Sequence, residues 1–301
     1  MTKNTRRCGF VSIIGAPNAG KSTLINKLVG AKVSIVSPKV QTTRTRVMGI
    51  VNRGSTQIVF VDTPGIFEPR KRLDRAMVSA AWQGAADAEI VLLIAEVARG
   101  KISPDTRAII AKLKKQDRKV ILVLNKIDLV EKEKLLKISS ELFETGMFTD
   151  IYMISALSGD GVERLLQDIA AKMPEGPWMF NEDQISDMPM RLLAAEITRE
   201  KIFLQLKEEL PYASTVETET WQEFENGSVK ISQIIYVMRD TQKAIILGKG
   251  GAQIKKIGEA ARLELEEILE RRVHLSLFVK VRENWGDDPD RYREWGLDPN
   301  A

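Results

Sequence analysis

Apolar runs and amphipathic stretches alternate along the first 177 residues. Short apolar runs bounded by turn residues predict strands at 8–14, 47–52, 56–61, 89–97, 119–125 and 150–155. Wider, helical spacing of the apolar positions predicts helices at 21–29, 71–83, 104–115, 131–146 and 161–173. Such alternation predicts an α/β domain with a mainly parallel sheet flanked by helices. The turn at 52–55 joins the one expected antiparallel pair.

The remaining residues follow a different order. After a Pro- and Gly-rich stretch, the pattern predicts a helix at 189–209, strands at 214–224 and 229–239, a helix at 251–258, a glycine-interrupted helix to about 271 and a strand at 273–281. This α-β-β-α-α-β order predicts a second, smaller α+β domain. We therefore expect domains at 1–176 and 189–283, a linker at 177–188 and a tail at 284–301. The tail is polar and is expected to pack loosely.

Composition narrows the possible chemistry. The single cysteine, Cys8, excludes an internal disulfide and fits a reducing cytoplasm, and the single histidine, His274, lies in an alternating strand pattern. Serine-triad, histidine-base and zinc chemistries therefore have almost no residues to use. No apolar run reaches transmembrane length, and no signal peptide is recognisable. The net charge of +4 permits an anionic partner without establishing one.

A glycine-rich octapeptide, Gly15 to Ser22, lies between the first predicted strand and the first predicted helix. Its glycines allow backbone N–H groups to surround phosphates, and Lys21 is expected to reach the β and γ phosphates. The Ser22 hydroxyl is expected to ligate Mg²⁺, and the helix N-terminus adds its positive dipole end. A chance glycine-rich turn is the alternative, and the correct flanking elements make it rarer.

The base is indicated by the segment Asn125 to Asp128, which follows a buried strand. The Asp128 carboxylate can accept hydrogen bonds from guanine N1–H and the 2-amino group. Adenine lacks both donors, so ATP would be disfavoured by about 10²-fold or more. Lys126 is expected to pack along the base, Asn125 to brace the loops, and the Ala156 N–H to face guanine O6. The nucleotide is therefore predicted to be GTP.

Two further segments predict the metal and γ-phosphate contacts. Asp62 is expected to hold Mg²⁺ through water, and the Gly65 N–H to sense the γ phosphate. Thr43 is expected to add a hydroxyl ligand, with Thr42 as the alternative. The loops at 37–46 and 66–75 are the expected order–disorder switches.

The full set of nucleotide-site residues follows from these motifs. Expected metal ligands are Ser22, Thr43 and Asp62. Expected GTP-binding residues are Gly15, Ala16, Pro17, Asn18, Ala19, Gly20, Lys21, Ser22, Asp62, Thr63, Pro64, Gly65, Ile66, Asn125, Lys126, Ile127, Asp128, Ser155 and Ala156.

These motifs resemble those of the Era family of bacterial GTPases, in the TrmE-Era-EngA-like group of translation-factor-related GTPases. The resemblance covers nearly the whole chain. It implies a P-loop GTPase domain followed by a type II KH domain, hydrolysis of GTP to GDP, and binding of the 3′ end of 16S ribosomal RNA during assembly of the 30S subunit. It also implies a cytoplasmic monomer with some peripheral association with the inner membrane, which nothing in the sequence requires.

Catalysis is expected to differ from that of Ras-like enzymes, which place a water-orienting Gln after the Asp-x-x-Gly motif. This chain has Ile66 there, which cannot hydrogen-bond water, so slow intrinsic hydrolysis is expected. In related GTPases, an Asn at the position of Asn18 helps to bind K⁺ beside the phosphates. The resemblance thus implies K⁺ stimulation, or else an Asn18 that only stabilises the loop. The residues expected to act in catalysis are Asn18, Lys21, Thr43 and Gly65.

A second glycine motif, Gly248 to Gly251, resembles the GXXG loop of KH domains. Such a turn between helices allows close approach of a nucleic-acid backbone. Residues 188–283 hold 15 Lys and Arg against 15 Asp and Glu, but 241–258 contains four lysines and no acid. The positive field is therefore local to the loop. Expected RNA-binding residues are Lys243, Gly248, Lys249, Gly250, Gly251, Lys255 and Lys256.

Two other functions remain compatible with these motifs. One is a metabolic NTP-using enzyme, which the guanine-type motif and the lack of a conventional catalytic base disfavour. The other is an RNA-binding module in which GTP is mainly structural.

Overall fold

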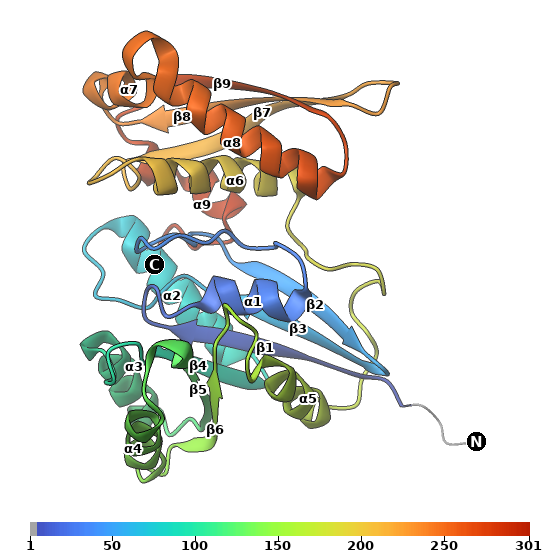
Figure 1. Cartoon of the computed structure of the whole chain (residues 1–301), viewed down its shortest axis with the longest axis vertical. Helices are drawn as coiled ribbons and strands as arrows, with labels where there is room; N and C mark the ends of the chain where they lie inside the picture. Colours follow the sequence, from blue (N-terminus) through green and yellow to red (C-terminus); the bar gives the residue numbers. More distant parts are fainter. Residues whose placement is uncertain (1–4) are drawn as a thin grey trace. The chain divides into compact units, whose positions relative to one another are not determined.

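The computed structural model describes residues 5–301, which cluster into two compact units. The first unit contains the chain up to Ser34, Thr43–Asp187 and Tyr292–Ala301, and the second contains Ile35–Thr42 and Met188–Arg291. Each unit has its own sheet, with six strands in the first and three in the second among these described residues (Figure 1).

The strands of the first unit form a mainly parallel sheet. They are β1 (Arg7–Gly15), β2 (Val47–Arg53), β3 (Thr56–Asp62), β4 (Ile90–Glu96), β5 (Val120–Asn125) and β6 (Phe148–Ile154). Their order is β2-β3-β1-β4-β5-β6, and all pairs are parallel except β2 with β3. The predicted parallel sheet with one antiparallel pair is confirmed. The carboxyl ends of β1, β3 and β5 therefore meet at one edge, where open α/β sheets bind ligands.

Helices cover both faces of this sheet (Figure 1). They are α1 (Lys21–Val29), α2 (Arg72–Asp87), α3 (Pro104–Lys115), α4 (Lys132–Phe143) and α5 (Val162–Lys172). Helices α1 and α5 pack against each other. Helices α2, α3 and α4 share a buried apolar cluster with β4 and β5, to which they contribute Ala85, Leu113 and Leu135. Burial of apolar area on both faces fixes the strand ends that carry the motifs.

The second unit has the predicted α-β-β-α-α-β order. Its elements are α6 (Met190–Gln205), β7 (Ser214–Glu223), β8 (Val229–Val237), α7 (Asp240–Leu247), α8 (Ala252–Leu269) and β9 (Val273–Val281), and α9 (Pro289–Glu294) follows. Strand β7 pairs antiparallel with β8, and β8 pairs parallel with β9. Apolar side chains of α6, α7 and α8 pack with those of the strands in a shared core.

The two helices around the second glycine motif differ in position from the prediction. Helix α7 ends before Gly248, and α8 runs without interruption past Gly258. Helix α7 has no sequence signal because it is short and buries one side chain, Ile246, so it lacks a periodic apolar face. Gly258 allows close packing instead of ending a helix, since a Cβ there would lie 3.3 Å from Leu277 Cδ1 on β9.

The segment Ile35–Thr42 lies in the second unit, where it contacts α6. The Val36 N–H donates to Glu200 Oε1 at 2.8 Å. Lys39 Nζ donates to the carbonyls of Phe203 and Leu206, at the C-terminal end of α6, where a cation also complements the helix dipole. No pattern in the sequence indicates these contacts, because they join residues more than 160 positions apart.

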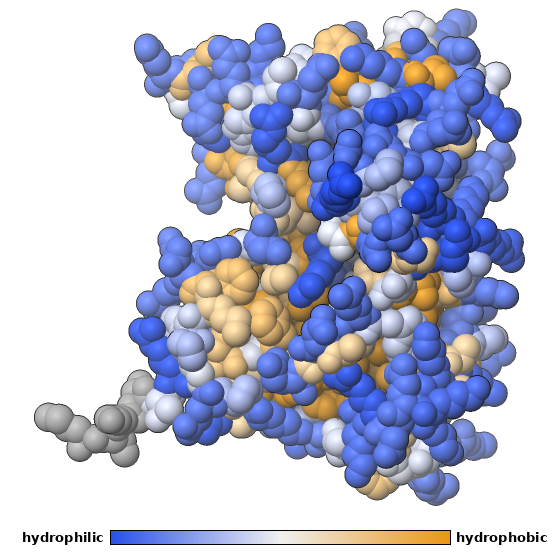
Figure 2. Space-filling view, turned by 180° about the vertical axis from the view of Figure 1, so that it is seen from behind, coloured by the Kyte–Doolittle hydropathy of each residue, from blue (hydrophilic) through white to orange (hydrophobic). Residues whose placement is uncertain are grey.

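Polar side chains cover most of the face seen in Figure 2, and smaller apolar areas lie between them. Large exposed apolar side chains include Leu136 and Phe143 of α4 and Leu157. In the part of the chain from residue 5 onward, no helix is long and apolar enough to span a bilayer.

Candidate functional site

The first glycine motif forms the turn between β1 and α1. Gly20 caps α1 with φ 99°, and a Cβ at Gly20 would lie 2.2 Å from Asn125 Nδ2. Only glycine meets both the positive φ and the close approach without strain. Asn18 lies at the exposed part of the turn with φ 61°. The loop therefore has the tight, backbone-lined form that phosphate binding needs.

Lys21 is buried beneath this loop. Its Nζ donates to the carbonyls of Gly15 at 3.2 Å and Ala16 at 3.0 Å. Burial lowers the pKa of the Lys21 ammonium to about 8, although the charge of Asp62 opposes this shift. Phosphate groups beside Lys21 would favour the protonated form that burial disfavours.

Four oxygen-bearing side chains converge beside Lys21. Ser22 Oγ lies 2.8 Å from Thr43 Oγ1 and donates to Asp62 Oδ2 at 2.8 Å. Ser34 Oγ donates to the same carboxylate oxygen at 2.8 Å. The other oxygen, Asp62 Oδ1, is buried and has no hydrogen-bond partner among the described residues. Burial raises the pKa of the Asp62 carboxyl, against the opposing effects of Lys21 and the hydroxyl donors.

This arrangement fits Mg²⁺. Hydroxyl and carboxylate oxygens are ligands that Mg²⁺ prefers, and a cation would satisfy the unpartnered Asp62 Oδ1 and favour the ionised carboxylate. In the described part of the chain, no three His, Cys, Asp or Glu side chains cluster as metal ligands. A cation here would therefore use one carboxylate, hydroxyls and nucleotide phosphates, which is the usual arrangement for Mg²⁺ in nucleotide sites.

The structure separates the two candidate threonines. Thr43 is buried beside Ser22. Thr42 Oγ1 instead donates to the Lys39 carbonyl at 2.7 Å and lies 2.6 Å from Ser37 Oγ. The structure thus brings Thr43, and not Thr42, to the residues proposed to hold Mg²⁺.

The base-side residues lie at the ends of β5 and β6. Asn125 Nδ2 donates to the Ala19 carbonyl at 2.8 Å, and Asn125 Oδ1 accepts from the Ala156 N–H at 2.9 Å. Asn125 thus connects the phosphate loop to the segment after β6. Lys126 has φ 67° and pairs with Glu96 at 2.8 Å, and Asp128 is exposed. Because Asn125 already accepts the Ala156 N–H, a contact of that group with guanine O6 would require a shared hydrogen bond.

The segment after β3 returns to the phosphate loop. The Ile66 N–H donates to the Gly15 carbonyl at 3.0 Å, and Thr63 Oγ1 donates to the Ile13 carbonyl at 2.9 Å. A Cβ at Gly65 would lie 3.0 Å from atoms of Pro17, so glycine allows the two loops to touch. The apolar Ile66 side chain is buried and offers no group that could orient water.

In the second unit, residues 248–251 connect α7 to α8. Gly248, Gly250 and Gly251 have φ of 71°, 61° and 78°. A Cβ at Gly250 or Gly251 would meet no heavy atom within 4 Å, so the backbone there is open to a ligand. The side chains of Lys249, Lys255 and Lys256 are exposed, and that of Lys243 is half-buried. The loop thus presents open backbone and cations together, as a phosphate-backbone contact requires.

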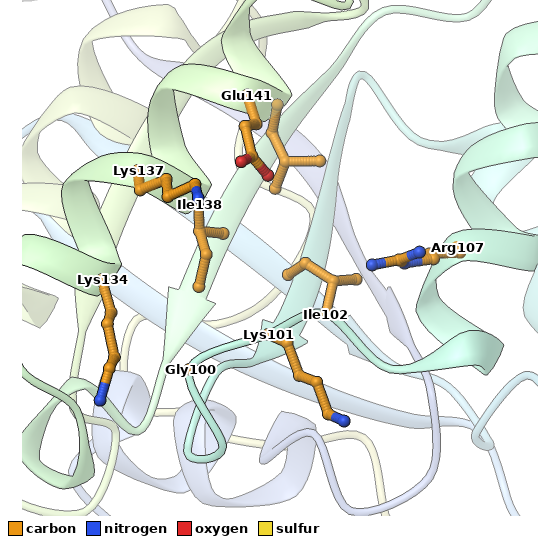
Figure 3. A pocket seen from close by; sticks show the side chains of 9 residues that line it. Gly100, Lys101, Ile102, Arg107, Lys134, Lys137, Ile138 and Glu141 are labelled. Atoms are coloured by element: carbon orange, nitrogen blue, oxygen red, sulfur yellow. The ribbon is translucent and has the colours of Figure 1, made fainter.

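A separate hollow of about 590 Å³ lies in the first unit between the loop after β4 and helix α4. Figure 3 shows the basic side chains of Lys101, Arg107 and Lys137 around Ile102 and Ile138. Its described lining includes no residue of the nucleotide motifs. This hollow is therefore distinct from the predicted nucleotide site.

Comparison with known proteins decides the family. A model described as 50S ribosome-binding GTPase matches residues 10–126, and a KH domain model matches residues 209–286. GTPase Era of Rhizobium meliloti (strain 1021) is 61% identical over 292 residues, which are 97% of this chain and 93% of that protein. The chain belongs to the Era family of GTPases. GTPase Era of Brucella suis biovar 1 is 59% identical over 97% of this chain and 94% of its own length.

Solved Era structures match nearly the whole chain. A crystal structure of Era in complex with MgGDPNP and nucleotides 1506–1542 of 16S ribosomal RNA has a TM-score of 0.90 and 41% identity, and covers 97% of this chain and 99% of that one. A variant of Aquifex aeolicus Era bound to GDP·AlF4⁻ has a TM-score of 0.89 and 41% identity, with 96% and 99% covered. The predicted fold class, a GTPase domain followed by a KH domain, is confirmed.

Two features of this Era-family chain differ from what its sequence predicts. One is the contact of Ile35–Thr42 with α6, which no motif indicates. The other is the tail, which is not loosely packed but buries Trp285 and Trp295. The tryptophans themselves are the available signal, since large aromatic side chains rarely stay exposed without a partner.

Proposed function

We propose that this protein is a GTP-hydrolysing switch whose KH domain binds the 3′ end of 16S ribosomal RNA and which assists assembly of the 30S subunit. The observation that carries the proposal is the match, over 97% of the chain, to an Era structure that holds both MgGDPNP and nucleotides 1506–1542 of that RNA. The cytoplasmic location, the monomeric state and the peripheral membrane association implied by the family belong to the same proposal.

The residues of the first unit have distinct roles in this proposal. Lys21 contacts the β and γ phosphates, and the Gly65 N–H contacts the γ phosphate. Ser22, Thr43 and Asp62 would hold Mg²⁺, which neutralises phosphate charge when bound. Asp128 selects guanine, and Asn125 keeps the two sides of the site together through its contacts with Ala19 and Ala156.

Measurement of GTP hydrolysis in the presence of RNA tests this function. We expect an RNA of the sequence 1506–1542 to bind and to change the rate of GTP hydrolysis, whereas a scrambled RNA of equal length does neither. Steady-state phosphate release and a filter-binding titration measure the two effects. Turnover that stays negligible with RNA and K⁺ present would favour the alternative, an RNA-binding module in which GTP is mainly structural.

The proposal includes a bound K⁺, which would stabilise the negative charge on the phosphates during hydrolysis. Asn18 lies at the exposed part of the phosphate loop, and an amide oxygen is a suitable ligand for a hard cation. We expect turnover to be about tenfold or more faster in KCl than in NaCl at equal ionic strength, and Asn18→Ala to remove the difference. Equal rates in both salts, with a silent Asn18→Ala, would exclude this role.

A further inference from the structure

The last part of the C-terminal tail, Tyr292–Ala301, belongs to the first unit. Tyr292 and Trp295 are 0% and 6% exposed, and their ring centroids lie 6.3 Å apart. Leu297 is also buried. The residues from Tyr292 onward cluster with the GTPase unit, although the residues before them belong to the second unit. Burial of two aromatic rings and a leucine shows that the tail has a fixed place there.

The end of the tail holds the first residue of α2. Arg72 donates to the Pro299 carbonyl from Nε at 3.0 Å and from Nη2 at 2.6 Å. The same guanidinium lies 5.8 Å from the centroid of the Tyr292 ring, within the range of a cation–π contact. Arg72 follows Gly65 by seven positions and belongs to the predicted switch at 66–75. The tail therefore contacts this switch through a charged donor.

The residues around Arg72 form one stiff turn. Asp74 Oδ2 accepts from the Arg70 N–H at 3.0 Å and from the Lys71 N–H at 2.9 Å. This carboxylate joins the segment before α2 to its first turn. A shift of Arg70 and Lys71 would therefore move the first turn of α2, which carries Arg72, as well.

The tail also meets the end of the other switch loop. The Arg46 N–H donates to the Trp295 carbonyl at 3.4 Å, and Arg46 Cβ lies 4.0 Å from the position of a Cβ on Gly296. Arg46 is three residues beyond Thr43, which in this structure lies beside Ser22. One short segment thus contacts both predicted switches while the proposed Mg²⁺ ligands are together.

We propose that the tail, Tyr292–Ala301, positions α2 through the contact of Arg72 with Pro299 and thereby favours the GTP-bound arrangement of the switches. The inference rests on the proposed GTPase function. Loops at such sites change their arrangement with the γ phosphate, so a contact made in one arrangement stabilises it. By linkage, removal of that contact must change the relative affinities for GTP and GDP.

The test compares nucleotide affinities of tail variants with those of the wild-type chain. We expect Arg72→Ala, and removal of residues 298–301, which deletes Pro299 but keeps the buried Leu297, each to weaken binding of a non-hydrolysable GTP analogue relative to GDP by about tenfold. The turnover number at saturating GTP should fall in parallel. The double variant should show no larger effect than either single variant, because both remove the same interaction. Arg72→Lys, which retains a donor, should lie between.

Arg75→Ala is the matched control, since Arg75 is an exposed arginine on the same helix. It should leave the ratio of the two affinities unchanged. A tail that only stabilises the fold would lower the melting temperature of the variants and leave this ratio unaltered, which would overturn the inference. A wild-type chain that binds no guanine nucleotide would instead refute the proposed function, so the two failures are distinguishable.

Discussion

Replacement of Asp128 by Asn is expected to lower the affinity for GTP and GDP by about 100-fold or more. The Asp128 carboxylate offers acceptors to guanine N1–H and the 2-amino group, whereas an Asn amide puts a donor against those donors. Xanthine has a carbonyl at C2, which accepts from the amide. The affinity of the variant for xanthosine triphosphate should therefore approach the affinity of the wild-type protein for GTP. Titration with fluorescent nucleotides at fixed Mg²⁺ measures both constants.

The position of Asp128 allows its substitution without an effect on folding. The residue is exposed in a short 3-10 turn, Ile127–Leu129, so its replacement leaves the core intact. Asp87→Asn, at an exposed carboxylate at the end of α2, is the control and should leave both affinities unchanged. Wild-type GTP affinity in Asp128→Asn would show that other groups recognise the base.

The local parts of the molecule could be predicted from the sequence because local rules decide them. The phosphate loop, the strand ends and the α1 and α3 helices depend on glycine positions, apolar periodicity and capping within a few residues. The Asn125 contacts with Ala19 and Ala156 also follow from parallel strands that end at one edge.

The long-range parts could not be predicted in this way. Arg72 meets Pro299 across 227 positions, and Lys39 meets Leu206 across 167, and neither pair has a periodic signal. Helix α7 has no periodic signal in the sequence, because it has no amphipathic face and buries one residue, Ile246. Tertiary packing of that residue stabilises the helix. Gly258 resembles a helix break in the sequence because its close packing against Leu277 of β9 is visible only in three dimensions.

Two negative charges placed in the 248–251 loop are expected to lower RNA affinity by about 100-fold at low salt. Lys249→Glu with Gly250→Asp is the suitable variant. Both positions are exposed, and a Cβ at Gly250 meets no heavy atom within 4 Å. Asp tolerates the left-handed φ of Gly250 better than most residues. Gly248→Asp would be a poorer choice, because a Cβ there would lie 2.7 Å from Gln253 Cβ and strain the fold.

The expected loss of RNA affinity is electrostatic. The loop offers sterically open backbone at Gly250 and Gly251 and the Lys249 ammonium to phosphates, and carboxylates at the same place repel phosphates. The dependence of log affinity on log salt should become shallower by about one unit for each phosphate that the loop no longer neutralises. Filter binding of the 1506–1542 RNA at several salt concentrations measures both quantities. GTP hydrolysis without RNA should be unchanged, since the predicted nucleotide site lies in the first unit. Thr42, the alternative to Thr43 as a Mg²⁺ ligand, is the exception and lies in the second unit.

Lys230→Glu with Asn226→Asp is the charge-matched control in the same unit. Both residues are exposed near the β7–β8 turn, and an Asp at position 226 can still accept the Ser228 N–H. It changes the net charge of the unit by the same amount as the loop variant but leaves the glycine loop intact. Equal RNA affinity in the two variants would mean that net charge, and not the loop, determines binding, and the assignment of the 248–251 loop as the RNA contact would then be wrong.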